Sequence, residues 1–170
     1  MSETTYQKLI ALLDQSHARY RLLDHPEEGR TEIVSRMRGH DPRDAAKCMI
    51  LIVKLGKKVT KYVLAVIPGD RQVSFTAIRT LFGASYSSFA SPEIAARLAG
   101  TVPGTVLPFS FDSDLELIVD PLVQESEEIY FNAARLDRSI ALRTHDYLSI
   151  VAPRIEQISE PRKENVVLGA

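Results

Sequence analysis

The apolar positions of this chain recur either with helical spacing or as short continuous runs, and the changes between the two patterns divide the chain into short elements. Apolar residues between Leu9 and Leu13 follow the helical spacing, with Thr4 or Thr5 as the capping residue. Four more helices are predicted from spacing, caps and terminal glycines: Thr31 to Arg38 before Gly39, Phe75 to Phe82 between Ser74 and Gly83, Pro92 to Gly100 after Ser91, and Asp146 to Val151 after a cap at Thr144.

A continuous apolar run gives the strongest strand prediction. It extends from Cys48 to Val53 between Lys47 and Lys54, and its β-branched residues are typical of a strand buried on both faces. After a turn at 55–58, the range from Val59 to Ile67 predicts a second strand, so the two should form a hairpin. Shorter strands are predicted at Tyr20 to Asp24, Ser85 to Phe89, Leu115 to Val119, Ile129 to Asn132 and Ile140 to Arg143.

Prolines and glycines mark the irregular segments. Thr101 to Phe111 contains Pro103, Gly104 and Pro108, which predict an ordered loop without regular structure. The range 161–170 predicts a flexible C-terminal tail. Because the short strands often follow one another, we expect residues 1–160 to form one mixed α/β domain, with a mixed, largely antiparallel sheet and helices packed outside it.

Composition narrows the class of protein. The 170 residues are 45% hydrophobic and 25% charged, which is typical of a globular domain rather than a disordered chain. The net charge of -1 removes bulk positive charge as a reason for non-specific nucleic-acid binding, although a local basic patch is compatible with it. Cys48, the single cysteine, excludes an internal disulfide and a cysteine-rich zinc site. We expect a reducing, cytoplasmic location, and no apolar run is long enough to cross a membrane.

The common catalytic motifs are absent. The sequence has no phosphate loop, no dinucleotide fingerprint, no G-x-S-x-G elbow and no H-E-x-x-H pair. Its histidines, His17, His25, His40 and His145, are scattered, so we predict neither a metal site nor a cofactor.

Lys47 is the first unusual residue, because a charged group at the start of an apolar strand costs free energy unless it reaches water or a partner. Alternation along the strand places Lys47, Met49 and Leu51 on one face and Cys48 on the other. One interpretation is a lysine that extends its ammonium to solvent at the strand end. The other is an ammonium at a pocket mouth, where it binds a phosphate or polarises a carbonyl oxygen. Cys48 is predicted to be a small buried hydrophobic residue rather than a nucleophile.

Three further places offer weaker candidates. Gly104 would let the backbone come close to a ligand, so that its N–H groups donate to an oxygen, or it is simply part of a turn. His25 precedes Pro26 in a loop, which is more typical of a surface residue than of a catalytic base. Asn132 and Ser139 could hydrogen-bond a small ligand or satisfy backbone groups.

Taken together, these segments resemble the YbaK/prolyl-tRNA synthetase-associated domain family of aminoacyl-tRNA editing domains. The resemblance covers roughly Tyr6 to Val151. No single segment is specific to the family, but the order and spacing of the segments together are. The carrying segments are Asp24-His25-Pro26, Ala46 to Ile50, Ser91-Pro92-Glu93, Leu98 to Gly100, the loop to Pro108, Ile118-Val119-Asp120 and Phe131 to Ala134. Leu107 to Phe111 and Phe131 to Ala134 are most similar to the YeaK-like branch.

The resemblance implies a barrel-like mixed sheet surrounded by helices and hydrolysis of the ester between a wrong amino acid and the 3′ end of tRNA. The family's lysine falls on Lys47 and its G-x-x-x-P loop on Gly104 to Pro108, so Lys47 and Gly104 are the expected catalytic residues, with a bound water as nucleophile. The family uses no metal, cofactor or covalent nucleophile. The residues expected to contact substrate are His25, Met49, Thr105, Pro108, Asn132 and Ser139, with Leu51 as a further lining residue.

Two departures from the family pattern concern the amino acid that is removed. Many members have Ser-Gly-Gly where this chain has Asn132-Ala133-Ala134, and many have an aspartate where it has Ser139. The YeaK-like features suggest seryl- or threonyl-tRNA, while alanyl- and cysteinyl-tRNA stay open. The alternatives to an editing enzyme are a non-catalytic module that binds an aminoacyl group, a nucleotide or a synthetase, and an unrelated ester hydrolase.

Partners are predicted from charge and from the resemblance. Four lysines cluster around the predicted hairpin: Lys54, Lys57, Lys58 and Lys61. They would form a basic patch that contacts tRNA, or a solvated hairpin tip without a partner. The expected partners are mischarged tRNA, read at its acceptor end, and an aminoacyl-tRNA synthetase or elongation factor.

Overall fold

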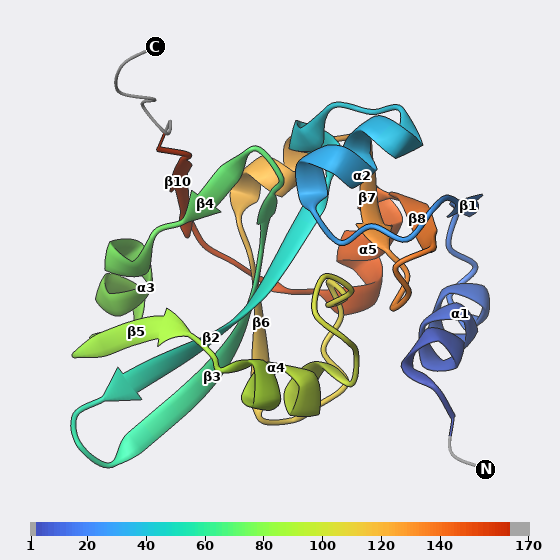
Figure 1. Cartoon of the computed structure of the whole chain (residues 1–170). Helices are drawn as coiled ribbons and strands as arrows, with labels where there is room; N and C mark the ends of the chain where they lie inside the picture. Colours follow the sequence, from blue (N-terminus) through green and yellow to red (C-terminus); the bar gives the residue numbers. More distant parts are fainter. Residues whose placement is uncertain (1–2, 164–170) are drawn as a thin grey trace.

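A long antiparallel hairpin forms the centre of the fold (Figure 1). The computed structural model describes residues 3–163. β2 (Ala46–Leu55) pairs with β3 (Val59–Pro68) along its whole length, from Ala46 opposite Pro68 to Leu55 opposite Val59. β5 (Tyr86–Phe89) extends this sheet antiparallel to β2, whereas β6 (Leu115–Val119) and then β9 (Arg154–Ile155) extend it in parallel beyond β3.

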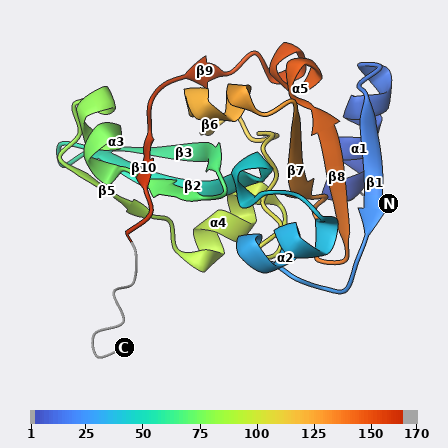
Figure 2. The same ribbon diagram turned by 90° about the horizontal axis from the view of Figure 1, so that it is seen from above.

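A second, fully antiparallel sheet lies beside the start of the hairpin, as the view from above shows (Figure 2). It has the order β1 (Tyr20–Asp24), β8 (Arg138–Arg143), β7 (Glu128–Asn132). An isolated bridge between Ala45 and Tyr130 joins the two sheets. β4 (Arg71–Val73) and β10 (Ser159–Pro161) form a small third sheet. The expected mixed α/β class with largely antiparallel strands is confirmed, and the strands are divided among three hydrogen-bonded sheets.

The helices are α1 (Thr5–Gln15), α2 (Thr31–Arg38), α3 (Phe75–Phe82), α4 (Pro92–Ala99) and α5 (Thr144–Val151), and short 3-10 turns are η1 (Pro42–Asp44) and η2 (Pro121–Glu125). α1, α3 and α4 begin at the capping residues that the sequence predicts, and α2, α3 and α4 end at the predicted glycines. Thr4 forms a capping box with Gln7, and the Ser74 and Ser91 hydroxyls accept the backbone N–H groups of Ala77 and Ile94. Gly39, Gly83 and Gly100 end their helices with positive φ.

The predicted cap at Thr144 is wrong. β8 runs directly into α5, so Thr144 is already the first helical residue and its hydroxyl is buried without a partner in the described chain. The carboxylate of Asp146 in the first turn instead accepts the Arg19 N–H at 2.9 Å and pairs with the Arg19 guanidinium. α5 is therefore held by an ion pair to the start of β1 rather than by a side-chain cap.

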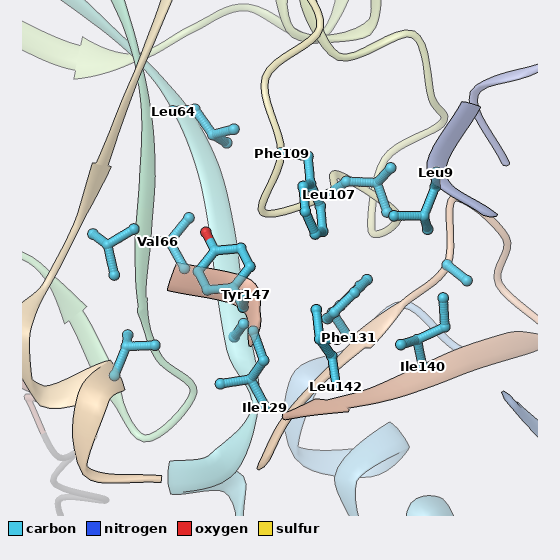
Figure 3. Packing of buried hydrophobic residues seen from close by; sticks show 14 of the residues in the cluster. Leu9, Leu64, Val66, Leu107, Phe109, Ile129, Phe131, Ile140, Leu142 and Tyr147 are labelled. Carbon is cyan, nitrogen blue, oxygen red and sulfur yellow. The ribbon is translucent and has the colours of Figure 1, made fainter. Parts of the chain in front are cut away.

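Alternation along the hairpin divides the core into two clusters. Cys48 and Ile50 face the larger cluster, which contains the side chains of Phe109, Phe131 and Tyr147 (Figure 3). Leu51 and Val53 face the smaller cluster under α3. The Tyr147 hydroxyl donates to the Pro108 carbonyl at 2.6 Å, and Leu107 and Phe109 are buried, so the core holds the loop that contains Gly104.

The C-terminal part contains structure that the sequence pattern does not predict. β9 and β10 return from α5 across the molecule to the region of α3 (Figure 2). The predicted flexible tail began at Pro161, but Pro161 belongs to β10 and Arg162 pairs with Glu32, so this beginning is held in place. Residues 164–170 of that predicted tail lie outside the described residues. Between residues 3 and 163, no helix is long and apolar enough to cross a membrane.

Candidate active site

A cavity of about 190 Å³ lies where the start of β2 meets β7. α2 and two loops, at 25–30 and 100–108, complete its wall. Polar groups in the lining come from Thr31, Arg38, Lys47, Tyr130 and Asn132. Two of these are cations, and no carboxylate or imidazole belongs to the lining in the described chain. The cavity therefore suits a small ligand that offers hydrogen-bond acceptors.

Lys47 brings an ammonium to this wall. Its side chain is half-buried, and its Nζ has no hydrogen-bond or ion-pair partner within residues 3–163. Burial lowers the pKa of Lys47 from its usual value, Arg162 lowers it further by repulsion, and Glu32 acts in the opposite direction. An ammonium without a partner at a cavity wall can donate to an incoming oxygen.

Two glycines bring the loops of the wall into contact. Gly104 has φ +86°, and a Cβ built on it would lie 2.9 Å from the Gly29 Cα. A Cβ on Gly29 would in turn lie 3.3 Å from the Gly104 Cα. Both the backbone conformation and the space at Gly104 therefore require glycine. Its N–H has no hydrogen-bond partner among the described residues, which leaves it available as a donor.

Asn132 fastens the same two loops. Its Nδ2 donates to the Glu28 carbonyl at 2.8 Å and to the Gly104 carbonyl at 3.1 Å. Its Oδ1 accepts from Arg38 Nη2 at 3.1 Å and from Ser139 Oγ at 2.9 Å. Both N–H groups of this buried amide are used within the protein, so Asn132 lines the cavity and holds its wall, and its predicted contact with substrate stays a prediction.

Arg38, at the end of α2, is the residue that sequence reasoning missed. Its Nε donates to Ser139 Oγ at 2.8 Å, and its Nη1 lies 3.2 Å from His40 Nε2. No carboxylate pairs with it in the described chain. Burial lowers the pKa of Arg38 to about 10, so it stays charged at neutral pH. One signal was available: Arg38 lies four positions after the buried Val34, on the inward face of the helix.

His25 and Ser139 lie behind this wall rather than in it. Ser139 is fully buried, and its hydroxyl contacts Arg38, Asn132 and, at 2.6 Å, His25 Nε2. His25 Nδ1 contacts the Pro26 carbonyl at 2.9 Å. Neither residue lines the cavity: Ser139 supports Arg38 directly and His25 does so through Ser139, while their predicted contact with substrate stays a prediction.

Three more predicted contact residues face away from the cavity. Thr105 is fully buried and its hydroxyl donates to the Val102 carbonyl at 2.7 Å. Pro108 is buried with its carbonyl bound to Tyr147, and Leu51 belongs to the cluster under α3. In contrast, Met49 lines the cavity together with Lys47 and Gly104.

Cys48 also touches the cavity but is not set up as a nucleophile. Burial raises the pKa of its thiol well above the usual value, and its Sγ donates to the Ala46 carbonyl at 3.4 Å. No group of three or more His, Cys, Asp or Glu side chains in residues 3–163 is arranged to hold a metal ion.

The hairpin lysines do not form one surface patch with the cavity. In the strand register Lys54 lies opposite Thr60 on β3 and Tyr86 on β5, and Lys61 lies opposite Val53 on β2. Because residues opposite each other share a face and Val53 and Lys54 are neighbours in β2, Lys54 and Lys61 lie on opposite faces of the hairpin. Lys54 Nζ lies 5.5 Å from the Tyr86 ring and Lys61 Nζ 5.8 Å from the Phe82 ring. All four lysines are exposed around the hairpin tip, at the far end of β2 from Lys47.

Comparisons with known proteins agree with this geometry. Residues 25–150 match the family model described as the aminoacyl-tRNA editing domain. The chain is 41% identical over 152 residues to the multifunctional Ser/Thr-tRNA deacylase ProXp-y of Escherichia coli strain K12, covering 89% of this chain and 90% of that protein.

Two solved structures share the fold. The crystal structure of a hypothetical protein superposes with a TM-score of 0.80 at 18% identity, covering 90% of this chain and 99% of that chain. The crystal structure of a putative trans-editing enzyme for prolyl tRNA synthetase superposes with a TM-score of 0.75 at 15% identity, covering 94% of this chain and 99% of that chain. The family match spans the cavity and all the segments that build it, and so the chain belongs to the aminoacyl-tRNA editing domain family.

Proposed function

We propose that this chain removes serine and threonine from mischarged tRNA by water attack on the aminoacyl ester. Hydrolysis of aminoacyl-tRNA is the activity of the family. What we propose is which amino acids this chain removes and by which mechanism. The observation that carries it is the unpartnered Lys47 ammonium beside the Gly104 loop on one small cavity. The relative of 41% identity, named as a Ser/Thr-tRNA deacylase, supports the choice of amino acids.

The volume of the cavity supports an aminoacyl group as its occupant. At about 190 Å³ it is smaller than the usual ligand pocket of about 300–1,000 Å³, which suits one small amino acid rather than a nucleoside. The terminal adenosine therefore stays at the mouth while the aminoacyl group enters. Bulky side chains are excluded by the walls, which is how such a site spares most correctly charged tRNAs.

Lys47 and Gly104 stabilise the charge that develops on the ester carbonyl oxygen. The ammonium of Lys47 and the N–H of Gly104 are both donors without partners within the described chain. Because an aminoacyl ester is already reactive, orienting it and stabilising the oxyanion is sufficient help for water to attack. The ester C–O bond then breaks, and the products are the amino acid and tRNA with its 3′-terminal hydroxyl restored. The partner of the reaction is mischarged tRNA, and a synthetase that releases it, such as prolyl-tRNA synthetase, is the proposed second partner.

The proposal is tested by deacylation of seryl-, threonyl-, alanyl-, cysteinyl- and correctly charged prolyl-tRNA. We expect hydrolysis of the first two and a loss of about 100-fold in kcat/KM for Lys47→Ala, as for removal of one oxyanion donor. Lys8→Ala, which changes an exposed lysine on α1, is the matched control and should keep full activity. Hydrolysis that survives Lys47→Ala would refute the mechanism. No hydrolysis of any substrate by the folded protein would refute the function and favour a binding module.

A further inference from the structure

Arg38 is a cation that the mechanism above does not use. Arg38 lines the cavity, and its guanidinium is held by hydrogen bonds to the buried Ser139 and Asn132. Asn132 is itself fixed by the two loops that it fastens. A guanidinium that is held in one orientation without a carboxylate needs another acceptor to compensate its burial.

A count of donors shows what Arg38 still offers. A guanidinium has five N–H groups and no acceptor. Its Nε–H and one N–H of Nη2 are used by Ser139 and Asn132. One N–H of Nη1 points to His40 Nε2, which is an acceptor because His40 Nδ1 donates to the Asp41 carbonyl at 2.8 Å. Each terminal nitrogen therefore keeps one N–H without a partner in the described chain.

We propose that Arg38 determines the specificity of the site by donating a hydrogen bond to the side-chain hydroxyl oxygen of the aminoacyl group. The inference rests on the proposed function. Lys47 and Gly104 are assigned to the carbonyl oxygen, and both N–H groups of Asn132 are used by carbonyls. The Tyr130 hydroxyl contacts Arg21, so Arg38 and the Thr31 hydroxyl remain, and of these only Arg38 is charged. Serine and threonine supply the acceptor that Arg38 lacks. Alanine offers no acceptor, so it would leave unpaired the N–H group that a hydroxyl oxygen accepts, which disfavours its binding.

The chemistry of Arg38 also separates a hydroxyl from two other small side chains. An ammonium in the same position has no acceptor and is repelled by the guanidinium. A carboxylate accepts well but is larger than a hydroxymethyl group, and the cavity of about 190 Å³ must hold the aminoacyl group and the attacking water, which occupies about 30 Å³. Serine and threonine therefore fit both the charge and the volume.

The experiment compares kcat/KM for seryl-, threonyl- and alanyl-tRNA in wild type, Arg38→Met and Arg38→Lys. Arg36→Met is the matched control, because Arg36 is exposed on the same helix. We expect Arg38→Met to lower the rate on seryl- and threonyl-tRNA by about 10–100-fold, the effect of one hydrogen bond to a charged group, and to change alanyl-tRNA by less than about threefold. Arg38→Lys should retain part of the preference, and Arg36→Met all of it.

The ratio of the seryl to the alanyl rate does not depend on how much of a variant is folded, so partial unfolding cannot imitate the result. A second test uses wild-type protein alone, with tRNA charged with 2,3-diaminopropionic acid, which replaces the serine hydroxyl by an ammonium. We expect this substrate to react more slowly than alanyl-tRNA.

Three results would overturn the inference. They are an unchanged seryl-to-alanyl ratio in Arg38→Met, hydrolysis of the diaminopropionyl ester as fast as the seryl ester, and aspartyl-tRNA as a better substrate than seryl-tRNA. If hydrolysis in these cases still depends on Lys47, only the role of Arg38 fails. If wild type hydrolyses no aminoacyl-tRNA, the proposed function fails together with it.

Discussion

At the scale of single residues, two cations, Lys47 and Arg38, line a cavity whose described lining contains no carboxylate. Lys47 is half-buried in a wall without carboxylates, and its lowered pKa reports the free energy lost by that placement. Such a residue is typical of a functional site, because stability is sacrificed for chemistry.

We expect Lys47→Met to be more stable than wild type and nearly inactive. Removing a desolvated cation should raise the free energy of unfolding by about 1 kcal/mol at pH 7, while activity falls about 100-fold. The protonated lysine disfavours the folded state at every pH below its folded pKa, and this penalty is lost as the pH rises from that pKa towards the usual value of 10.5. Urea unfolding of both proteins at pH 7 measures the gain in stability, and the same measurement at pH 10 shows whether the difference between them becomes smaller. A variant less stable than wild type at pH 7 would contradict the expectation.

Gly104 gives a second expectation at this scale. Gly104→Ala meets a positive φ and a contact of 2.9 Å with the Gly29 backbone, so the two loops must separate. We expect a loss of about 2 kcal/mol in stability and a fall in kcat of at least tenfold, as one oxyanion donor moves. Gly83→Ala is the control, because Gly83 also has positive φ, +61°, but nothing lies within 4 Å of its Cβ position. It should lose stability and keep kcat, and equal losses of kcat in both variants would count against the role of Gly104.

The residues that sequence reasoning misplaced share a physical cause. Thr105 and Pro108 follow Gly104 in an irregular loop, where no period tells which side chains face the cavity. Lys47 and Met49 share one face of a strand and both line the cavity, as alternation predicts, although Cys48 between them also touches the cavity and Leu51 does not. Arg38 lies on a helix whose orientation depends on tertiary packing, so its spacing from Val34 indicates an inward face but not the cavity that this face lines.

At the scale of elements, the sequence predicted those parts whose causes are local. α3 and α4 have a serine cap and a terminal glycine within ten residues, and the long hairpin has its own turn. β4, β9 and β10 were missed because each has only two or three residues and its partner lies far away in the chain. Their stability comes from long-range hydrogen bonds that no local pattern encodes.

Asp120 is the residue that ties these late strands to the hairpin sheet. It is fully buried, its Oδ1 accepts the Leu122 N–H at 2.9 Å, and its Oδ2 accepts the N–H groups of Ile158 and Ser159 at 3.0 and 2.9 Å. Asp120→Asn would turn an amide NH₂ towards backbone donors, so we expect it to cost about 2 kcal/mol. Chemical denaturation checks the value, with the exposed Asp70→Asn as control. Unchanged stability would show that this carboxylate is dispensable.

At the scale of the whole molecule, the two sheets meet at the Ala45–Tyr130 bridge, and the cavity lies at that junction. The site is therefore a product of tertiary structure, with side chains from β2, β7 and α2 that are far apart in sequence. The resemblance to editing domains pointed to Lys47 and the Gly104 loop, and both line this cavity, whereas the supporting network of Ser139, Asn132 and His25 became visible only in the fold.

The position of the hairpin limits what its lysines can do. β2 continues for eight residues from Lys47 to Leu55 at about 3.3 Å per residue, so Lys57, in the turn that follows, lies more than about 25 Å from the Lys47 backbone. We expect Lys57→Glu/Lys58→Glu to raise KM for full-length seryl-tRNA and to leave the hydrolysis of a short aminoacylated CCA fragment unchanged, because only the longer substrate reaches the hairpin tip. If each lysine contacts one phosphate, the slope of log(kcat/KM) against log[salt] should become shallower by about 2. If the substitutions slow hydrolysis of the short fragment as much as that of full-length tRNA, they disturb the cavity itself. If neither substrate is affected, the lysines form a solvated tip that does not contact tRNA.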